Sequence, residues 1–546
     1  MADLGRRVGQ WFARDRTRPA GTGQAAPTPA PPRPGVVEII RGGETLWGTP
    51  ANAAHWDDLA DANLRFVVDA LRAGGVEPFL LDAPRSGRRQ VVILDTQRGA
   101  AREALVAAKE SDAVYLSEPS TGRKRPTPEP LGDSGFEGSR WLIHRLFTTP
   151  QGQPLAAEDA ACEVQLWTES TADTPPLGNH ELFEVGSLLA PGFTNRWTHV
   201  LPPEERHFVQ VQVAERTLPA PPGLQGRHIF DPAMPIDVVY TWVDGGDPEW
   251  QRRKAAALGT LESDSHRLSG NPSRFESHDE LRYSLRSLAF YADWVNHIWV
   301  VTDGQVPSWL TLDHPRLTVV DHRSIFRDPS VLPVFNSHAI ESQLHHIDGL
   351  SEHYLYLNDD VFFTAPATPD QYVLANGITQ FHPSSLTIGL GSARAGDTPV
   401  AAAAKQNRTL VREVGGVEIS HRMQHVAHPL RRSVMAEVEE RFPREFATTA
   451  SARLRSPSDL SVVPLAHYYG FLTGQAVPGR IRARYADIAN PDAPGKLRSL
   501  LELRNFDQLC LNDTASEALD VDARRRLVGD FLASYFPYAS PWERSS

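Results

Sequence analysis

Apolar residues in the second half of the chain form short runs separated by segments with helical spacing. The runs at 236–242, 294–302, 316–322 and 353–363 predict strands, and the spacing predicts helices at 277–292 and 336–351. Ser277 and Glu280 predict a capping box for the first helix, and Gly349 ends the second. The order strand, helix, strand, strand, helix, strand is typical of an open α/β sheet, whose ligands bind beyond the carboxyl ends of the strands.

The first half of the chain also alternates between strand and helix patterns. Apolar runs predict strands at 37–41 and 91–94, and helical spacing predicts helices at 57–75 and 97–111. The second helix leads into a further strand at 113–117, which gives a βαβ-like unit. Since the region contains neither a phosphate-loop glycine pattern nor a cluster of potential metal ligands, its pattern predicts an accessory α/β domain of unstated role.

Stretches rich in Pro, Gly and Ala divide the chain into domains. Residues 1–35 end in such a stretch and predict a disordered tail and linker, followed by the accessory domain at 36–220. A Pro/Gly-rich stretch at 218–235 marks the next boundary. We therefore expect a catalytic domain at 236–480 and a helical C-terminal extension at 481–546 that packs on it.

Composition places the protein among acidic globular chains. Its 546 residues include 55 Lys and Arg against 67 Asp and Glu, and the net charge of −12 argues against a nucleic-acid binder. Cys162 and Cys510 are the only cysteines, which excludes a disulfide scaffold and a cysteine-based zinc site. The sequence has no apolar run of the roughly 18–20 residues that a membrane helix needs, and no signal-peptide core. We therefore expect a cytoplasmic protein.

Acidic residues follow two of the predicted strands. Asn358, Asp359 and Asp360 interrupt the last apolar run, and two adjacent carboxylates suit Mg²⁺ or Mn²⁺, which in turn bind substrate phosphates. An Asp–Asp pair is as common in plain turns, so these residues alone leave both interpretations open. Asp244 and the two glycines after it form a second acidic turn, for which a tight Asp–Gly turn is the simpler interpretation.

Histidines and arginines gather later in the chain. His425 and His428 are three residues apart, so on a helix they would share a face, and a His of near-neutral pKa can accept a proton from a hydroxyl. Arg455 can bind phosphate oxygens through two donors. The alternatives are a solvated histidine pair and a helix start at Ser456, in which Asp459 is only a cap.

Four blocks of the second half resemble the Stealth family. They are IDVVYTWVDGGDP, the block from Arg274 to Leu310, the block from Phe335 to Phe363, and HVAHPLRRSVMAEVEERFPREF with RLRSPSD. This family contains bacterial capsular and exopolysaccharide phosphotransferases and the catalytic subunit of the animal N-acetylglucosamine-1-phosphotransferase. The resemblance covers roughly 236–475 and leaves the first 220 residues and the C-terminal tail outside.

The resemblance implies a transferase of phosphorus-containing groups. Such an enzyme moves a hexose 1-phosphate from a nucleotide-diphosphate sugar to a glycan hydroxyl, releases a nucleoside monophosphate, and builds phosphodiester-linked surface polysaccharide. We expect Mg²⁺ or Mn²⁺ as cofactor and a Rossmann-like or glycosyltransferase-A-like sheet that is open and mostly parallel. The expected partners are the donor and the glycan acceptor, and a peripheral contact with polysaccharide machinery at the inner face of the membrane fits this role.

The resemblance also implies a role for each candidate residue. His425 corresponds to a general base and Arg455 to a phosphate clamp, with Asp359 and Asp360 as metal ligands. The remaining candidates surround the nucleotide, substrate or metal: Asp244 and Glu276 as catalytic residues, and Asp237, Arg282, Asn358 and His428 as substrate-binding residues.

Two further functions stay open on the sequence alone. The first is a metal-dependent glycosyltransferase that uses the same donor but releases a nucleoside diphosphate. The second is a non-catalytic protein that binds a sugar nucleotide or glycan. Identifying the released nucleotide distinguishes all three functions.

Overall fold

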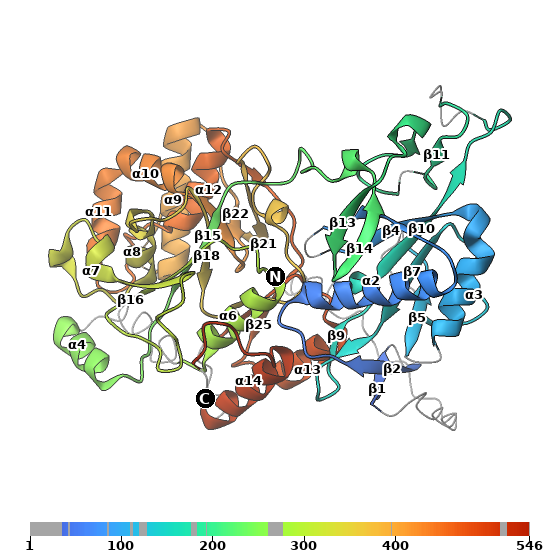
Figure 1. Ribbon diagram of the computed structural model, residues 1–546. Helices are drawn as coiled ribbons and strands as arrows, with labels where there is room; N and C mark the ends of the chain where they lie inside the picture. Colours follow the sequence, from blue (N-terminus) through green and yellow to red (C-terminus); the bar gives the residue numbers. More distant parts are fainter. Residues whose placement is uncertain are drawn as a thin grey trace, which may run out of the picture.

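The computed structural model describes residues 35–544 except 42–43, 85–86, 110–112, 120–127, 176–182, 193, 260–276, 395 and 514–520. The predicted tail at 1–34 and the candidate Glu276 therefore lie outside the described residues. The described chain has two α/β halves, joined by the segment between β14 (Arg216–Ala220) and β15 (Ile236–Thr241) (Figure 1).

A five-stranded sheet forms the centre of the second half. Its strand order is β17 (Leu317–Asp321), β16 (Ile298–Thr302), β15, β18 (His353–Asn358) and β23 (His428–Arg431). The first four strands are parallel, and β23 is antiparallel to β18. The register pairs Thr241 with Asn358, so the carboxyl ends of β15 and β18 lie side by side. These elements confirm the predicted α/β class.

Alternate side chains of the central strands pack on opposite faces of this sheet. Val238 and Tyr240 belong to one core with α6 (Glu280–Tyr291), whereas Val239 and Tyr356 belong to a second core on the other face. The helices of the second core are α7 (His322–Ile325), α8 (Ser337–Glu341), α9 (Pro399–Gly415), α10 (Arg432–Arg441), α11 (Pro443–Ser451) and α12 (Val462–Leu472). Burial on both faces explains why these strands read as continuous apolar runs.

Helix α6 begins three residues later than its sequence predicts. Asp279 precedes its first residue with a left-handed backbone, φ 65°, so the helix starts at Glu280. The Glu280 carboxylate still accepts a hydrogen bond from the backbone N–H of His278, at 2.6 Å. The predicted reciprocal bond, from the Glu280 N–H to the Ser277 hydroxyl, is replaced by a bond from the Asp279 N–H to that hydroxyl, at 3.3 Å. Ser277 and Glu280 therefore do mark the start of a helix, but α6 begins three residues later than they predict.

The prediction of one helix at 336–351 is wrong, because the observed helix is much shorter. Helix α8 ends at Glu341, and a 3₁₀ turn, η8 (Leu344–His346), follows it. The Ser342 hydroxyl donates to the Ala339 carbonyl, and the Gln343 amide donates to the Ser342 carbonyl. Side chains that bond to the nearby backbone compete with the helical pattern, which accounts for the break.

The C-terminal extension contains strands as well as the helices that were expected. Strand β26 (Gln508–Asn512) pairs with β19 (Val361–Phe363) and with β25 (Ala483–Asp487). Helices α13 (Ala493–Leu503) and α14 (Val521–Tyr535) complete the extension. The other elements of this half are α4 (Pro248–Leu258), β20 (Thr379–Phe381), β21 (Pro383–Thr387), β22 (His421–Met423) and β24 (Ala476–Pro478).

An eight-stranded sheet forms the first half, with helices α2 (Trp56–Ala73) and α3 (Arg98–Ala108). Strands β4 (Arg89–Leu94) and β5 (Val114–Ser117) run in the same direction, with two strands between them. The predicted strand–helix–strand unit is therefore confirmed. Further strands of this half include β1 (Val37–Arg41), β2 (Glu44–Pro50), β3 (Phe79–Asp82), β7 (Arg140–Arg145) and β10 (Cys162–Glu169).

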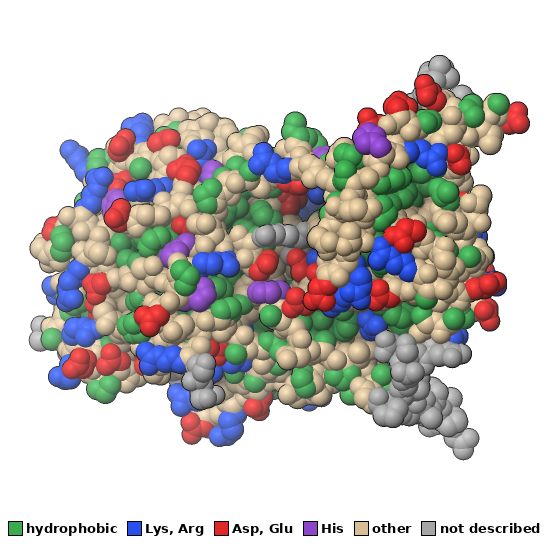
Figure 2. Space-filling view, viewed as in Figure 1, with side chains coloured by type: hydrophobic (Ala, Val, Ile, Leu, Met, Phe, Trp, Pro, Cys, Tyr) green, Lys and Arg blue, Asp and Glu red, His purple; other side chains and the backbone are tan. Residues whose placement is uncertain are grey.

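The two halves share one apolar core. Trp56 and Phe147 of the first half are buried in the same cluster as Tyr291 of the second. The ring of His55 also donates from Nδ1 to the carbonyl of Ala289, at 3.0 Å. Acidic and basic side chains are interspersed over both halves on the face drawn in Figure 2. Every helix in the described ranges is too short or too polar to cross a membrane.

Candidate active site

A cavity of about 750 Å³ opens at the carboxyl end of β18. Its walls come from β18, β21, β22, β25, α8, α9 and α12, and from the loop between β22 and β23. Four residues selected from the sequence line it: Asn358, His425, His428 and Arg455. The same walls carry residues that sequence reasoning missed: His338, Glu341, Arg422, Arg484 and Tyr485.

His425 lies in the loop between β22 and β23, with its ring open to the cavity. This segment forms a loop and a strand instead of the helix considered for the histidine pair. The ring packs against Tyr485, with the two ring centroids 5.3 Å apart. Surrounding protein, and then the charges of Arg455 and Arg422, lower the pKa of His425. The imidazole is therefore neutral near pH 7 and can accept a proton.

Arg455 is held at the cavity wall by α8. Its Nη2 donates to the hydroxyl of Ser337, the first residue of that helix, at 2.7 Å. Burial lowers the pKa of Arg455, and the nearby carboxylate of Glu341 opposes this change. A guanidinium in this position presents a fixed positive charge to a ligand in the cavity.

The turn that follows Arg455 is fastened to the start of α8 through Asp459. Ser456 and Pro457 belong to a turn, and the next helix, α12, begins only at Val462. Asp459 is fully buried, and its Oδ2 accepts hydrogen bonds from the Ser456 N–H and from the Asn336 amide, at 2.9 and 2.8 Å. Asp459 therefore fastens this turn to the residue that caps α8, as a buried anchor and not as a helix cap.

His428 faces a second histidine behind the cavity wall. Its Nδ1 lies 3.2 Å from Nε2 of His467, at hydrogen-bond distance. Burial, followed by the charges of His425 and His382, lowers the pKa of His428 to about 3. The ring is therefore neutral at physiological pH, and its bond to His467 fixes its orientation.

An acidic group lies next to the cavity, directly after Asn358. Burial raises the pKa of Asp359, Asp360 and Glu280, and the charge of Asp359 adds to the rise at Glu280. One oxygen of Asp360, Oδ2, accepts a weak bond from the Cys510 thiol at 3.5 Å, and the other, Oδ1, is buried with no hydrogen-bond partner. A half-buried pair of carboxylates with one buried, unsatisfied oxygen fits a bound cation.

Two other acidic candidates lie at opposite ends of β15. Asp244 stands in the turn after the strand, where its Oδ1 accepts the Gly246 N–H at 2.8 Å; it lies outside the cavity lining. Asp237 is near the start of β15, far from this turn. Its carboxylate accepts bonds from Asn296, Trp299 and the backbone of Ser351, at 2.8, 3.0 and 2.9 Å. These bonds connect the start of β15 to β16 and to the segment before β18, so the contacts of Asp237 are structural.

Arg282 makes a structural contact instead of reaching the cavity. Its Nε donates to Oε2 of Glu543 at 2.6 Å, and Arg286 donates from Nε to Oε1 of the same carboxylate at 2.7 Å. Burial raises the pKa of Glu543, but hydrogen bonds from Arg286, the Ser540 N–H and Arg282 lower it to about 2. The pair on α6 therefore anchors the C-terminal segment.

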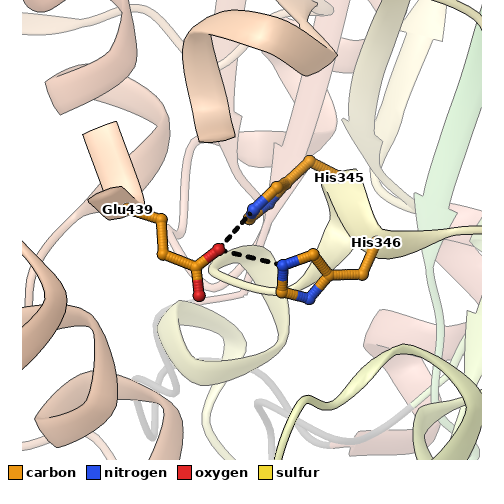
Figure 3. Close-up of side chains that lie close together, drawn as sticks. All are labelled: His345, His346 and Glu439. Carbon is orange, nitrogen blue, oxygen red and sulfur yellow. Dashed lines mark hydrogen bonds and ion pairs between the residues drawn. The ribbon is translucent and has the colours of Figure 1, made fainter. Parts of the chain in front are cut away.

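A second group of potential ligands lies outside the cavity. His345 and His346 in η8 and Glu439 in α10 point toward one another (Figure 3). One donor atom from each lies within 4.8 Å of the others, an arrangement that can hold a metal ion. It is the one group of three or more His, Cys, Asp or Glu residues with that spacing among the described residues.

Comparison with protein families matches four regions of this chain. They are Stealth conserved region 1 at 234–262, region 2 at 274–381, region 3 at 424–470 and region 4 at 498–546. An exopolysaccharide phosphotransferase of Streptomyces coelicolor, SCO6023, is 39% identical over 543 residues, covering 93% of this chain and 88% of that protein. The chain belongs to the Stealth family.

Other Stealth relatives agree with this assignment. A second exopolysaccharide phosphotransferase of Streptomyces coelicolor, SCO6021, is 41% identical over 74% of this chain and 75% of its own. The exopolysaccharide phosphotransferase CpsY of Mycobacterium tuberculosis is 39% identical over 63% of this chain and 65% of its own. The apo structure of the bifunctional glycosyltransferase WbbM aligns with a TM-score of 0.28 at 10% identity, over 58% of this chain and 51% of that one, too low to assign a fold.

The Stealth regions extend further along the chain than the sequence blocks suggested. Region 4 covers the C-terminal segment, which the resemblance had left outside, and includes Glu543 and Cys510. All the sequence candidates lie in regions 1 to 3. Arg422 and Arg484 lie outside the four matched regions, so only the fold reveals their position at the cavity. Arg422 had one available signal, since it stands three residues before His425.

Proposed function

We propose that this Stealth protein is an exopolysaccharide phosphotransferase that moves a hexose 1-phosphate from a nucleotide-diphosphate sugar to a glycan hydroxyl. One observation supports this most: His425 and Arg455, from separate segments, line one cavity at the carboxyl end of β18. A neutral base beside fixed positive charges is what the transfer of a phosphoryl group to a hydroxyl needs. The names of the relatives support the same reaction class.

His425 takes the proton of the acceptor hydroxyl in the proposed reaction. Its ring lines the cavity, and surrounding protein, followed by the charges of Arg455 and Arg422, keeps it neutral before the acceptor arrives. The acceptor oxygen then forms a bond to the phosphorus that carries the sugar. The bond from this phosphorus to the bridging pyrophosphate oxygen breaks, and a nucleoside monophosphate leaves. The proton remains on Nδ1 or Nε2 of His425 until the product departs.

Arg455 and Arg422 hold the phosphates of the donor. Arg455 is oriented by Ser337, so its guanidinium loses little freedom when it binds an oxyanion. The Nε of Arg422 is buried and has no hydrogen-bond partner among the described residues, which leaves a donor for a ligand oxygen. Together they offset the charge of a pyrophosphate and stabilise the negative charge that develops on the leaving group.

Asp359 and Asp360 are the residues we propose as ligands for Mg²⁺ or Mn²⁺. The unpartnered Oδ1 of Asp360 and the raised pKa of both carboxyl groups fit a cation at this place. Such an ion neutralises phosphate oxygens when it is bound. We also propose that the second half has a glycosyltransferase-A-like arrangement and that the protein acts at the cytoplasmic side of the membrane.

The identity of the released nucleotide tests the reaction. The purified chain is incubated with a panel of UDP-, GDP- and CDP-sugars, glycan acceptors and Mg²⁺, and the nucleotides are separated by chromatography. We expect a nucleoside monophosphate in equal amount to the phosphodiester product. Release of a nucleoside diphosphate alone would establish the glycosyltransferase instead. Donor binding without any released nucleotide across the panel would favour the non-catalytic protein.

A further inference from the structure

The cluster of His345, His346 and Glu439 is separate from the cavity and has no part in the proposed reaction. Oε2 of Glu439 lies 2.8 Å from Nε2 of His345 and 2.9 Å from Nε2 of His346 (Figure 3). All three side chains are shielded, with exposed fractions of 2%, 18% and 10% in the order His345, His346, Glu439. Two imidazole nitrogens and one carboxylate oxygen therefore converge on one protected point.

The hydrogen bonds of His346 define which of its nitrogens carries a proton. Its Nδ1 lies 3.0 Å from the carbonyl oxygen of Ile325, which only accepts, so Nδ1 carries the proton. In the neutral ring, Nε2 then directs a lone pair at the carboxylate oxygen of Glu439. Two lone pairs at 2.9 Å repel each other, so this contact requires either a second proton on His346 or a cation to which both atoms bind.

The surroundings favour the cation. A histidine that binds a metal through one nitrogen usually donates from the other to a backbone carbonyl, as His346 does to Ile325. The second oxygen of Glu439, Oε1, lies 3.6 Å from Nε of Arg327, which helps to orient the carboxylate. Two imidazoles and one carboxylate suit a borderline ion such as Zn²⁺ better than they suit Mg²⁺, which prefers oxygen ligands and retains water.

We propose that His345, His346 and Glu439 bind one divalent transition-metal ion of the Zn²⁺ class, which fastens η8 to α10. This link joins two parts of the cavity wall. Helix α8, which carries His338 and Glu341, ends just before η8, and β23, which begins with His428, leads directly into α10. The ion stabilises the position of both segments without touching the substrate.

Metal titration of the full chain tests the proposal without measuring catalysis. The protein is stripped with a chelator, dialysed and mixed with one equivalent of Zn²⁺, or of Co²⁺ as a spectroscopic probe. We expect about one ion per chain to remain after gel filtration, visible absorption bands of a nitrogen-ligated Co²⁺ site, and a rise in Tm of at least about 2 °C with Zn²⁺. These three signals should be lost in His346→Ala and in Glu439→Gln, which keeps the size of the side chain.

Two matched variants give this experiment its controls. His207→Ala removes an exposed histidine of the first half, and Asp359→Asn removes a proposed Mg²⁺ ligand; both should retain the Zn²⁺ and Co²⁺ signals. The proposal is wrong if the unmodified chain retains less than about a tenth of an equivalent. It is equally wrong if Glu439→Gln binds the ion with the same stoichiometry and the same Co²⁺ spectrum. Neither result would bear on the proposed phosphotransfer.

Discussion

Two pairs of arginines in the second half of the molecule have very different surroundings. Arg282 and Arg286 lie one turn apart on α6, and both donate to the carboxylate of Glu543, at 2.6 and 2.7 Å. Arg422 and Arg455 line the cavity instead, where Arg455 donates to a serine hydroxyl and Arg422 retains a buried Nε without a partner among the described residues.

The two pairs differ in what their guanidinium groups face, since one pair donates to a buried carboxylate and the other lines a cavity. A guanidinium that is already bound to a buried carboxylate has its charge and its donors occupied, so it stabilises the fold. The Arg455 guanidinium lies near the Glu341 carboxylate and lines the cavity, where its charge adds to burial in lowering the pKa of His425. Both Arg282 and Arg455 lie in matched family regions, and the sequence offered both as site candidates.

Removal of the divalent ion should have the largest effect, because arginines alone would then offset the donor phosphates. With EDTA followed by dialysis, transfer should fall below detection, and added Mg²⁺ or Mn²⁺ should restore it. Full activity in the chelated protein would show that the cavity arginines suffice and that the metal assignment is wrong.

His425→Ala should lower turnover by about 10²–10⁴, because it removes the proposed base, whose pKa burial and the cavity arginines lower. The release of nucleoside monophosphate measures the effect. His207→Ala is the control, because His207 is exposed in the first half of the chain, and it should leave the rate unchanged. A folded His425→Ala variant with a near-normal rate would exclude this role.

Arg455→Ala should lower kcat/KM by about 10²–10³, because a charge stabiliser of the leaving group is lost. Arg453→Ala is a matched control two residues away: this exposed arginine donates to the Ala257 carbonyl, and its loss should change kcat/KM little. The comparison between the two arginine pairs would fail if Arg282→Ala lowered kcat/KM as strongly as Arg455→Ala while the protein remained folded.

Arg422→Gln should shift the acid limb of the pH–rate profile. The rate falls as His425 becomes protonated, which occurs below its ordinary pKa because burial, Arg455 and Arg422 all disfavour the charged ring. Removing the Arg422 charge raises the pKa of His425, so the limb should move to higher pH. A limb that stays in place, or moves to lower pH, would contradict this electrostatic coupling.

Glu543→Gln should have a small effect on turnover and a measurable effect on stability. The loss of its charge-assisted bonds to Arg282 and Arg286 should lower the free energy of unfolding by about 1–3 kcal/mol at pH 7. Since the folded pKa of Glu543 is about 2, below its ordinary 4.5, this contribution is present above pH 4.5 and is lost as the pH falls toward 2. Chemical denaturation at several pH values measures it.

Much of the second half could be predicted from local patterns. The runs that form β15, β16, β17 and β18 and the start signal of α6 lie close to the observed elements, because strand and helix preferences depend on neighbouring residues. The resemblance also selected His425 and Arg455, which share the cavity. The break after α8 was missed because side chains such as Ser342 formed local bonds that periodicity does not register.

The sequence by itself determined the α/β class, the acidic turns at the strand ends and the membership of the Stealth family. Only the tertiary structure decided that Arg282 meets Glu543, that Arg484 reaches the cavity through β25, and that His345 and His346 face Glu439. These pairs are far apart in the chain, and their contacts depend on how sheets and helices pack after loops close. Local preference contains no information about such contacts, whereas packing fixes them.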